Sequence, residues 1–172
     1  MQAKLQSANE PQLRVEAQFG DGVEPPDGYD FERFASQIFR LCWRNGFADV
    51  FLARAGDVAE VPLCIRLVNE SEGQTLNQEW RDKPSATNVL SFTADIVAGA
   101  FAPLGDLVLC SAVVEREALA QNKALLDHYT HLLVHGMLHL LGYDHIVETE
   151  ADAMEAMEVL VLKELGVENP YD

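Results

Sequence analysis

The chain has 172 residues, a hydrophobic share of 48% and a formal net charge of −16, which suits one globular unit with a sizeable core. This charge argues against broad, sequence-independent binding of nucleic acid, which depends on many lysine and arginine contacts with phosphate. No apolar run approaches the roughly twenty residues of a membrane span, and no signal peptide is evident, so we expect no membrane partner. Three widely spaced cysteines indicate neither a disulfide framework nor a cysteine metal site, which favours the cytoplasm.

The spacing of apolar residues predicts four strands and about five helices after a leader, residues 1–11, that we expect to be disordered. Strands are predicted over residues 13–19, 61–69, 89–93 and 105–111. Helices are predicted to begin near residues 29–30, 70, 111, 127 and 149, with a loop rich in alanine and glycine over residues 96–103. No repeat or linker divides residues 12–172, which should form a single metal-dependent hydrolase domain. The expected fold class is α+β, a small mixed four-stranded sheet with helices packed around a buried, histidine-bearing central helix.

All five histidines fall between residues 128 and 145. His135 and His139 are four residues apart, so a helix presents both on one face. Gly142 favours a helix stop that lets His145 turn towards them. Three imidazoles converging in this way suit one zinc ion with an open position for water, although Ni²⁺ or another divalent transition metal fits the same ligands. Metzincin proteases share this spacing, but they carry a general-base glutamate where this chain has Gly136.

Three residues near these ligands have more than one interpretation. His131 and His128 lie four and seven residues before His135, on roughly the same helical face. They could support the metal ligands or act beside the substrate, but a solvent-exposed or capping role is favoured for each. Asp144 either orients a ligand histidine or only shapes the turn after Gly142, and both interpretations are kept.

A second polar segment precedes the strand predicted at residues 89–93. Arg81 and Lys83 supply a bidentate phosphate binder and a point charge, respectively. Taken alone, the segment favours a surface loop that leads into an edge strand. Beside a metal site the balance moves towards phosphate binding, with Lys83 and Asn88 as candidate substrate-side residues.

These motifs resemble those of the YbeY family, single-domain bacterial endoribonucleases that act in ribosomal RNA maturation. Residues 135–145, HGMLHLLGYDH, are similar to the family's signature. Residues 76–92, with Arg81 ahead of Thr-Asn, resemble a second motif, and the sequence GDLVL that begins at residue 105 resembles a third. One departure is Ala86, where the family usually has proline. The likeness runs from about residue 60 to the end of the chain, while the first fifty residues match weakly.

The resemblance implies a zinc-dependent RNA hydrolase in which His135, His139 and His145 hold the metal and Arg81 is needed for activity. It also implies a role in ribosomal RNA processing and ribosome quality control, with RNA of the small ribosomal subunit as the expected substrate. Because the chain is strongly acidic, we expect the ribosome or ribosome-associated proteins to help target it. A metal cleft favours single-stranded RNA, whose backbone can be splayed.

Two other classes of function stay open on the sequence. A metzincin-like metallopeptidase is favoured by the histidine spacing and disfavoured by Gly136. A ribosome-assembly or RNA-binding factor with a structural metal is compatible with the acidic composition. An Arg81→Ala variant separates the last class from an enzyme, since a binding module should lose affinity where an enzyme loses turnover.

Overall fold

A mixed four-stranded sheet lies at the centre of the computed structural model, which describes residues 10–96, 102–144 and 146–172. Its strands in chain order are β1 (Gln12–Phe19), β2 (Glu60–Val68), β3 (Val89–Thr93) and β4 (Gly105–Cys110). They lie side by side in the order β1-β2-β4-β3. Strands β1, β2 and β4 are parallel to one another, and β3 runs antiparallel to β4 at one edge of the sheet. The predicted α+β class with a small mixed sheet is confirmed.

Six helices accompany the sheet within the described residues. They are α1 (Phe31–Arg44), α2 (Asp49–Ala55), α3 (Glu70–Arg81), α4 (Ser111–Ala120), α5 (Leu125–Leu140) and α6 (Glu148–Glu164). Five of them match the predicted helices, whereas α2 was not predicted because seven residues are too few to establish a helical period. None of the helices described is both long and apolar enough to cross a membrane.

Parts of three predictions fall on residues that the structure does not describe. The expected leader, residues 1–11, lies outside the described residues up to residue 9, and Pro11 is already buried. The predicted loop over residues 96–103 is described only at residues 96, 102 and 103. His145, the predicted third metal ligand, also lies outside the described residues.

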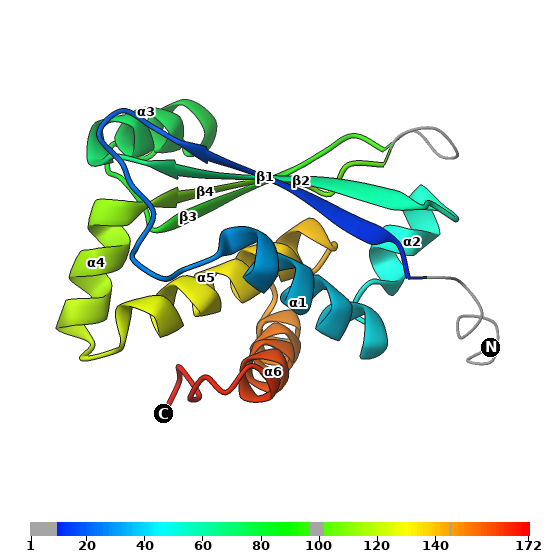
Figure 1. Cartoon of the computed structure of the whole chain (residues 1–172). Helices are drawn as coiled ribbons and strands as arrows, with labels where there is room; N and C mark the ends of the chain where they lie inside the picture. Colours follow the sequence, from blue (N-terminus) through cyan, green and yellow to red (C-terminus); the bar gives the residue numbers. More distant parts are fainter. Residues whose placement is uncertain (1–9, 97–101, 145) are drawn as a thin grey trace.

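The helices are divided unequally between the two faces of the sheet (Figure 1). Helices α1, α5 and α6 lie below the sheet in this view, and α3 lies above it. Beneath α3 a small buried cluster joins Val68, Leu90, Val108, Cys110 and Val113. No helix of the described residues covers the rest of that outer face, where β1, β2 and β4 present polar side chains, among them Arg14, Glu16 and Asp106.

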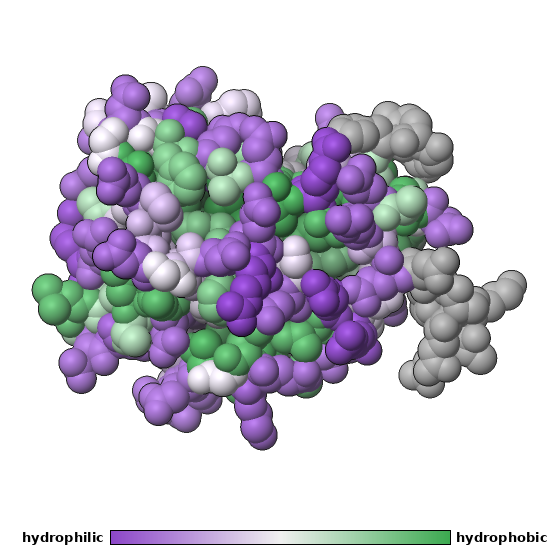
Figure 2. All heavy atoms as spheres, viewed as in Figure 1, coloured by the Kyte–Doolittle hydropathy of each residue, from purple (hydrophilic) through white to green (hydrophobic). Residues whose placement is uncertain are grey.

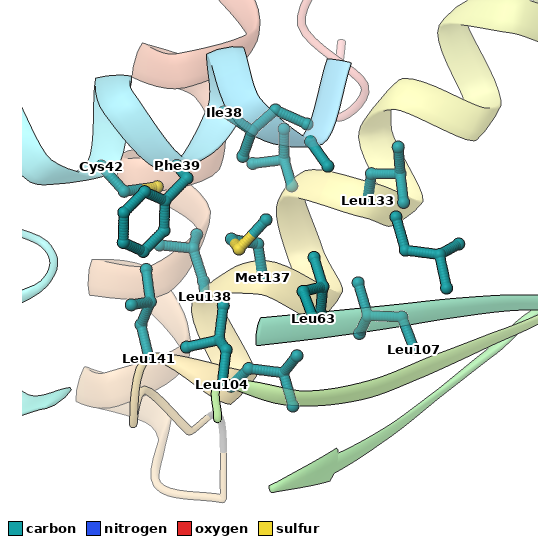
Figure 3. Close-up of a cluster of buried hydrophobic side chains, with 14 of the residues drawn as sticks. Ile38, Phe39, Cys42, Leu63, Leu104, Leu107, Leu133, Met137, Leu138 and Leu141 are labelled. Atoms are coloured by element: carbon teal, nitrogen blue, oxygen red, sulfur yellow. The ribbon is translucent and has the colours of Figure 1, made fainter. Parts of the chain in front are cut away.

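Helix α5 lies at the centre of the main core, which confirms the predicted buried, histidine-bearing central helix. Leu133, Met137, Leu138 and Leu141 pack between the sheet and α1, where Figure 3 shows them among Leu63, Leu104, Leu107, Ile38, Phe39 and Cys42. All these side chains are at most 2% exposed. Hydrophilic residues cover most of the outer surface in the view of Figure 2, with hydrophobic side chains between them. The histidines of α5 are thus carried by an element that the core holds on several sides.

Gly136 allows α5 to lie directly against the sheet. A Cβ atom at this position would come within 2.6 Å of Leu107 Cδ2 and 3.3 Å of Ser91 Oγ. Leu107 is fully buried and has little room to move. A side chain at position 136 would therefore push the helix and its histidines away from β3 and β4.

Candidate active site

His135 and His139 lie one helical turn apart at the C-terminal end of α5. Their Nε2 atoms are 3.1 Å apart, and their ring centroids are 4.6 Å apart at 80°. The helix ends at Leu140, and Gly142 takes a φ of +108°, a left-handed conformation that suits glycine. The predicted helix stop is therefore confirmed at the residue where the chain must turn towards position 145.

The second nitrogen of each ring is fixed by an oxygen acceptor. His135 Nδ1 contacts Glu158 Oε1 from α6, and His139 Nδ1 is 3.0 Å from the backbone oxygen of Tyr143. An Nδ1–H that donates to oxygen fixes the tautomer whose Nε2 carries a lone pair. Both rings therefore direct Nε2 lone pairs towards the same region.

This arrangement suits a divalent transition metal. Two zinc–nitrogen bonds of about 2.0–2.1 Å at a tetrahedral angle place their nitrogens roughly 3.3 Å apart, close to the 3.1 Å between the two Nε2 atoms. Within the described part of the chain, no group of three histidine, cysteine, aspartate or glutamate side chains is placed to hold a metal ion. The predicted set of His135, His139 and His145 is described for its first two members only, so the third stays a prediction.

Glu158 is a site residue that the sequence analysis missed. It is 1% exposed, and besides His135 it contacts the hydroxyl of Tyr171 and lies 3.5 Å from His131 Nε2. Burial alone would raise the pKa of Glu158, but interactions with His131, His135 and Tyr171 outweigh burial and lower the pKa to about 2. The carboxylate is therefore ionised at neutral pH and holds His135 from behind.

The signal for Glu158 was present in the sequence. It lies four residues after Met154 and three before Val161, and so interrupts the apolar face of α6. A carboxylate on a buried helix face needs a hydrogen-bonding or charged partner. The helix that carries the histidines offered such partners. Tyr171 gave no comparable signal.

A cleft of about 610 Å³ opens in front of the two histidines. Arg54, Arg81 and Lys83 line it, together with backbone and side chains of the edge strand β3. Asp144, from the turn after α5, lies in the same lining. Three cations thus gather in one cleft of a chain whose net charge is −16. Such a cleft attracts an anionic backbone that most of the surface would repel.

The end of α3 positions Arg81 in this cleft. Arg81 is the last residue of the helix, and its Nη2 donates to the backbone oxygen of Ser91 on β3 at 3.3 Å. Asp82 follows with a left-handed φ of 55°, which turns the chain into the loop that carries Lys83. The buried Asn77 holds this loop through its Nδ2, which donates to the backbone oxygen of Ser85 at 2.5 Å. Arg81 and Lys83, the pair predicted to bind phosphate, therefore line the same cleft as His135 and His139.

The other candidate residues lie behind the cleft. Asn88 Nδ2 donates to Glu117 at 3.0 Å, and His128 Nε2 lies 2.9 Å from the same carboxylate. His128 is only 3% exposed and the His131 side chain only 15%. Among the residues that the structure describes, no side chain caps the N-terminus of α5. The expectation that these two histidines are solvent-exposed or capping is wrong, because Glu117 and Glu158 from neighbouring helices cover them.

Comparison with known proteins identifies relatives of most of this chain. The family described as "Endoribonuclease YbeY" matches residues 42–166. The endoribonuclease YbeY of Stenotrophomonas maltophilia (strain R551-3) is 53% identical over 127 residues, which are 71% of this chain and 79% of that protein. The protein of the same name from Pseudomonas fluorescens (strain Pf-5) is 55% identical over 122 residues, covering 70% and 80%. A solution structure of TM1509 from Thermotoga maritima covers 90% of this chain and 91% of its own at 22% identity, with a TM-score of 0.46.

Proposed function

Because this chain belongs to the endoribonuclease YbeY family, we propose that it is a metal-dependent endoribonuclease that hydrolyses phosphodiester bonds of single-stranded RNA. The observation that carries the proposal is that His135, His139, Arg81 and Lys83 line one cleft. We further propose ribosomal RNA, in particular that of the small subunit, as the substrate. The ribosome or its associated proteins would supply the targeting that an acidic chain needs, and the expected location is the cytoplasm.

The histidine pair, with His145 as the proposed third ligand, would hold one zinc ion per chain or another divalent transition metal. When bound, such a metal lowers the pKa of its water to about 7 and so supplies hydroxide at neutral pH. Glu158 keeps the His135 ring oriented through Nδ1, and the backbone of Tyr143 does the same for His139. The chain therefore needs no separate strong base at position 136.

Arg81 is placed to bind the scissile phosphate. A guanidinium has five N–H donors. In Arg81, Nη2 donates to the backbone oxygen of Ser91, and this hydrogen bond holds the side chain against β3. Donors aimed at phosphate oxygens offset the charge that develops there during displacement. Lys83 adds a second positive charge in the same lining, while Asp144 is the acidic group beside it.

A metallopeptidase is a weaker alternative. The metzincin general base would have to occupy position 136, and that position faces Leu107 and Ser91 of the sheet. A glutamate there would have no room without displacing α5.

The test is RNA cleavage together with metal analysis of the purified protein and of a His139→Ala variant. We expect the wild type to carry about one transition-metal ion per chain and to cleave a single-stranded RNA internally, and we expect chelation to stop this cleavage. The His139→Ala variant should lose both the metal and the activity. Cleavage that survives chelation and this substitution would contradict the proposal, as would cleavage of a peptide library without cleavage of RNA.

A further inference from the structure

The outer face of the sheet carries a second hollow, of about 820 Å³, directly beside the histidine cleft. Both hollows include Arg81, Ser91 and Thr93 in their linings, so they meet along the edge strand β3. The outer hollow also contains Trp80 and Phe92. A nucleic-acid strand whose phosphate is bound at Arg81 would therefore have this second hollow next to it.

Trp80 is held in place although most of it faces solvent. It lies in the last turn of α3 and is 62% exposed. Its ring stands edge-to-face on Phe92, with centroids 5.7 Å apart and an interplanar angle of 69°. Phe92 itself packs against the buried cluster beneath α3. An indole that is already braced on one side loses little conformational freedom when another ring stacks on it.

The two hollows differ in charge, and each suits a different part of a nucleotide. In the outer hollow, Arg66 is paired with Glu72 at 2.7 Å. The shared Arg81 is matched there by the carboxylate of Asp106, so neither sign dominates around the tryptophan. In the cleft, Arg54, Arg81 and Lys83 gather positive charge. Proteins that bind single strands combine a basic path for the backbone with aromatic rings on which bases stack. The cleft supplies the first of these features, and Trp80 supplies the second.

We propose that Trp80 forms a stacking subsite for the base of a nucleotide adjacent to the phosphodiester bound at Arg81. This inference rests on the proposed function, because it takes single-stranded RNA as the occupant of the cleft. Stacking on an indole tolerates all four bases, since every base has a π-face. The subsite therefore increases the affinity for RNA and fixes the position of the RNA strand in the cleft, without selecting a base sequence.

The test compares cleavage of single-stranded RNA by the wild type and by Trp80→Ala and Trp80→Phe variants. Leu119→Ala is the matched control, because Leu119 is 85% exposed on α4 and lines neither hollow. We expect Trp80→Ala to raise KM by about 5- to 100-fold with kcat retained, and Trp80→Phe and Leu119→Ala to stay near wild type. An RNA of the same length without bases should bind the wild type and Trp80→Ala equally weakly.

A fluorescence titration gives a readout that does not depend on cleavage. The chain has two tryptophans, so Trp43→Phe leaves Trp80 as the sole emitter, and we expect RNA to quench it. An unchanged KM in Trp80→Ala, an unquenched indole, or a loss of kcat alone would each overturn the subsite and leave protein docking or support of Arg81 as the role of this residue. If the wild type cleaves no RNA, the proposed function fails, while quenching by RNA still decides whether the subsite exists.

Discussion

The two ends of α5 place histidines in different surroundings. The front pair, His135 and His139, faces a cleft lined by Arg54, Arg81 and Lys83. The rear pair, His128 and His131, is buried near the carboxylates of Glu117 and Glu158. Because Glu158 also contacts Nδ1 of His135, a neighbouring carboxylate does not distinguish the two pairs. The front pair is distinguished by its two Nε2 atoms, which lie 3.1 Å apart in residues that line the cleft and are therefore suited to bind a metal. The position of the ring nitrogens, and not the residue type or the helix, separates the two roles.

Arg81→Ala should give the largest effect, because it removes the cation that faces the front pair. Loss of a donor to a developing negative charge typically costs about 10²–10³-fold in kcat. Arg81 is exposed, so the free energy of unfolding should hardly change. The measurement is steady-state RNA cleavage together with urea unfolding, with Arg14→Ala on the opposite edge strand as the control. A kcat within a few-fold of wild type would remove Arg81 from the catalytic machinery.

Glu158→Gln should weaken metal binding by about 10- to 100-fold, the usual cost of losing a group that orients a ligand histidine. Glu158 is the link between the pairs, since it contacts His135 and lies near His131. Competition with a chromophoric chelator measures the affinity without reference to activity. Tyr171→Phe, which removes one hydrogen bond from the same carboxylate, should give a smaller change in the same direction. Unaltered affinity in both variants would confine Glu158 to a structural role.

The same carboxylate gives a pH test of stability. The pKa of Glu158 in the folded state, about 2, lies below the ordinary glutamate value of 4.5. Its contribution to the free energy of unfolding is therefore fully present above pH 4.5 and is lost as the pH falls towards 2. The difference in unfolding free energy between wild type and Glu158→Gln should therefore shrink over this range in metal-free protein. Urea unfolding at several pH values measures it, and a constant difference would show that Glu158 is not held as an anion.

The sequence predicted those features of α5 that depend on nearby residues. The spacing of His135 and His139, the apolar length of the helix and the stop at Gly142 are all local patterns, and each is found in the structure. Packing between segments that are distant in the sequence sets the order of the strands and the contact of α3 with β3 at Arg81. A local sequence pattern therefore could not predict either feature. The burial of His128 was missed for the same reason, because Glu117 covers it from another helix.

Gly136→Ala should destabilise the fold by about 1–3 kcal/mol, the usual cost of forcing extra volume into a packed core. The new methyl group would meet the fully buried Leu107 at 2.6 Å on the sheet side of α5. Because His135 and His139 would move together with the helix, metal affinity in the folded protein should change less than stability. Chemical denaturation and the chelator competition measure stability and metal affinity separately, and a larger loss of metal affinity than of stability would show that the substitution disturbs the two histidines relative to each other.

His128→Leu should have the smallest effect on the cleft and should act on the rear pair alone. The substitution keeps the apolar volume but removes the contact of 2.9 Å with Glu117, at a cost of about 1.5–3 kcal/mol for a hydrogen bond to a charged group. Glu117 retains Asn88 as a partner, so the carboxylate is not left isolated. Metal content and kcat should stay at the wild-type level while the unfolding midpoint falls. A loss of metal or of kcat instead would show that the rear pair acts on the cleft, and the division of α5 into a structural end and a catalytic end would then be wrong.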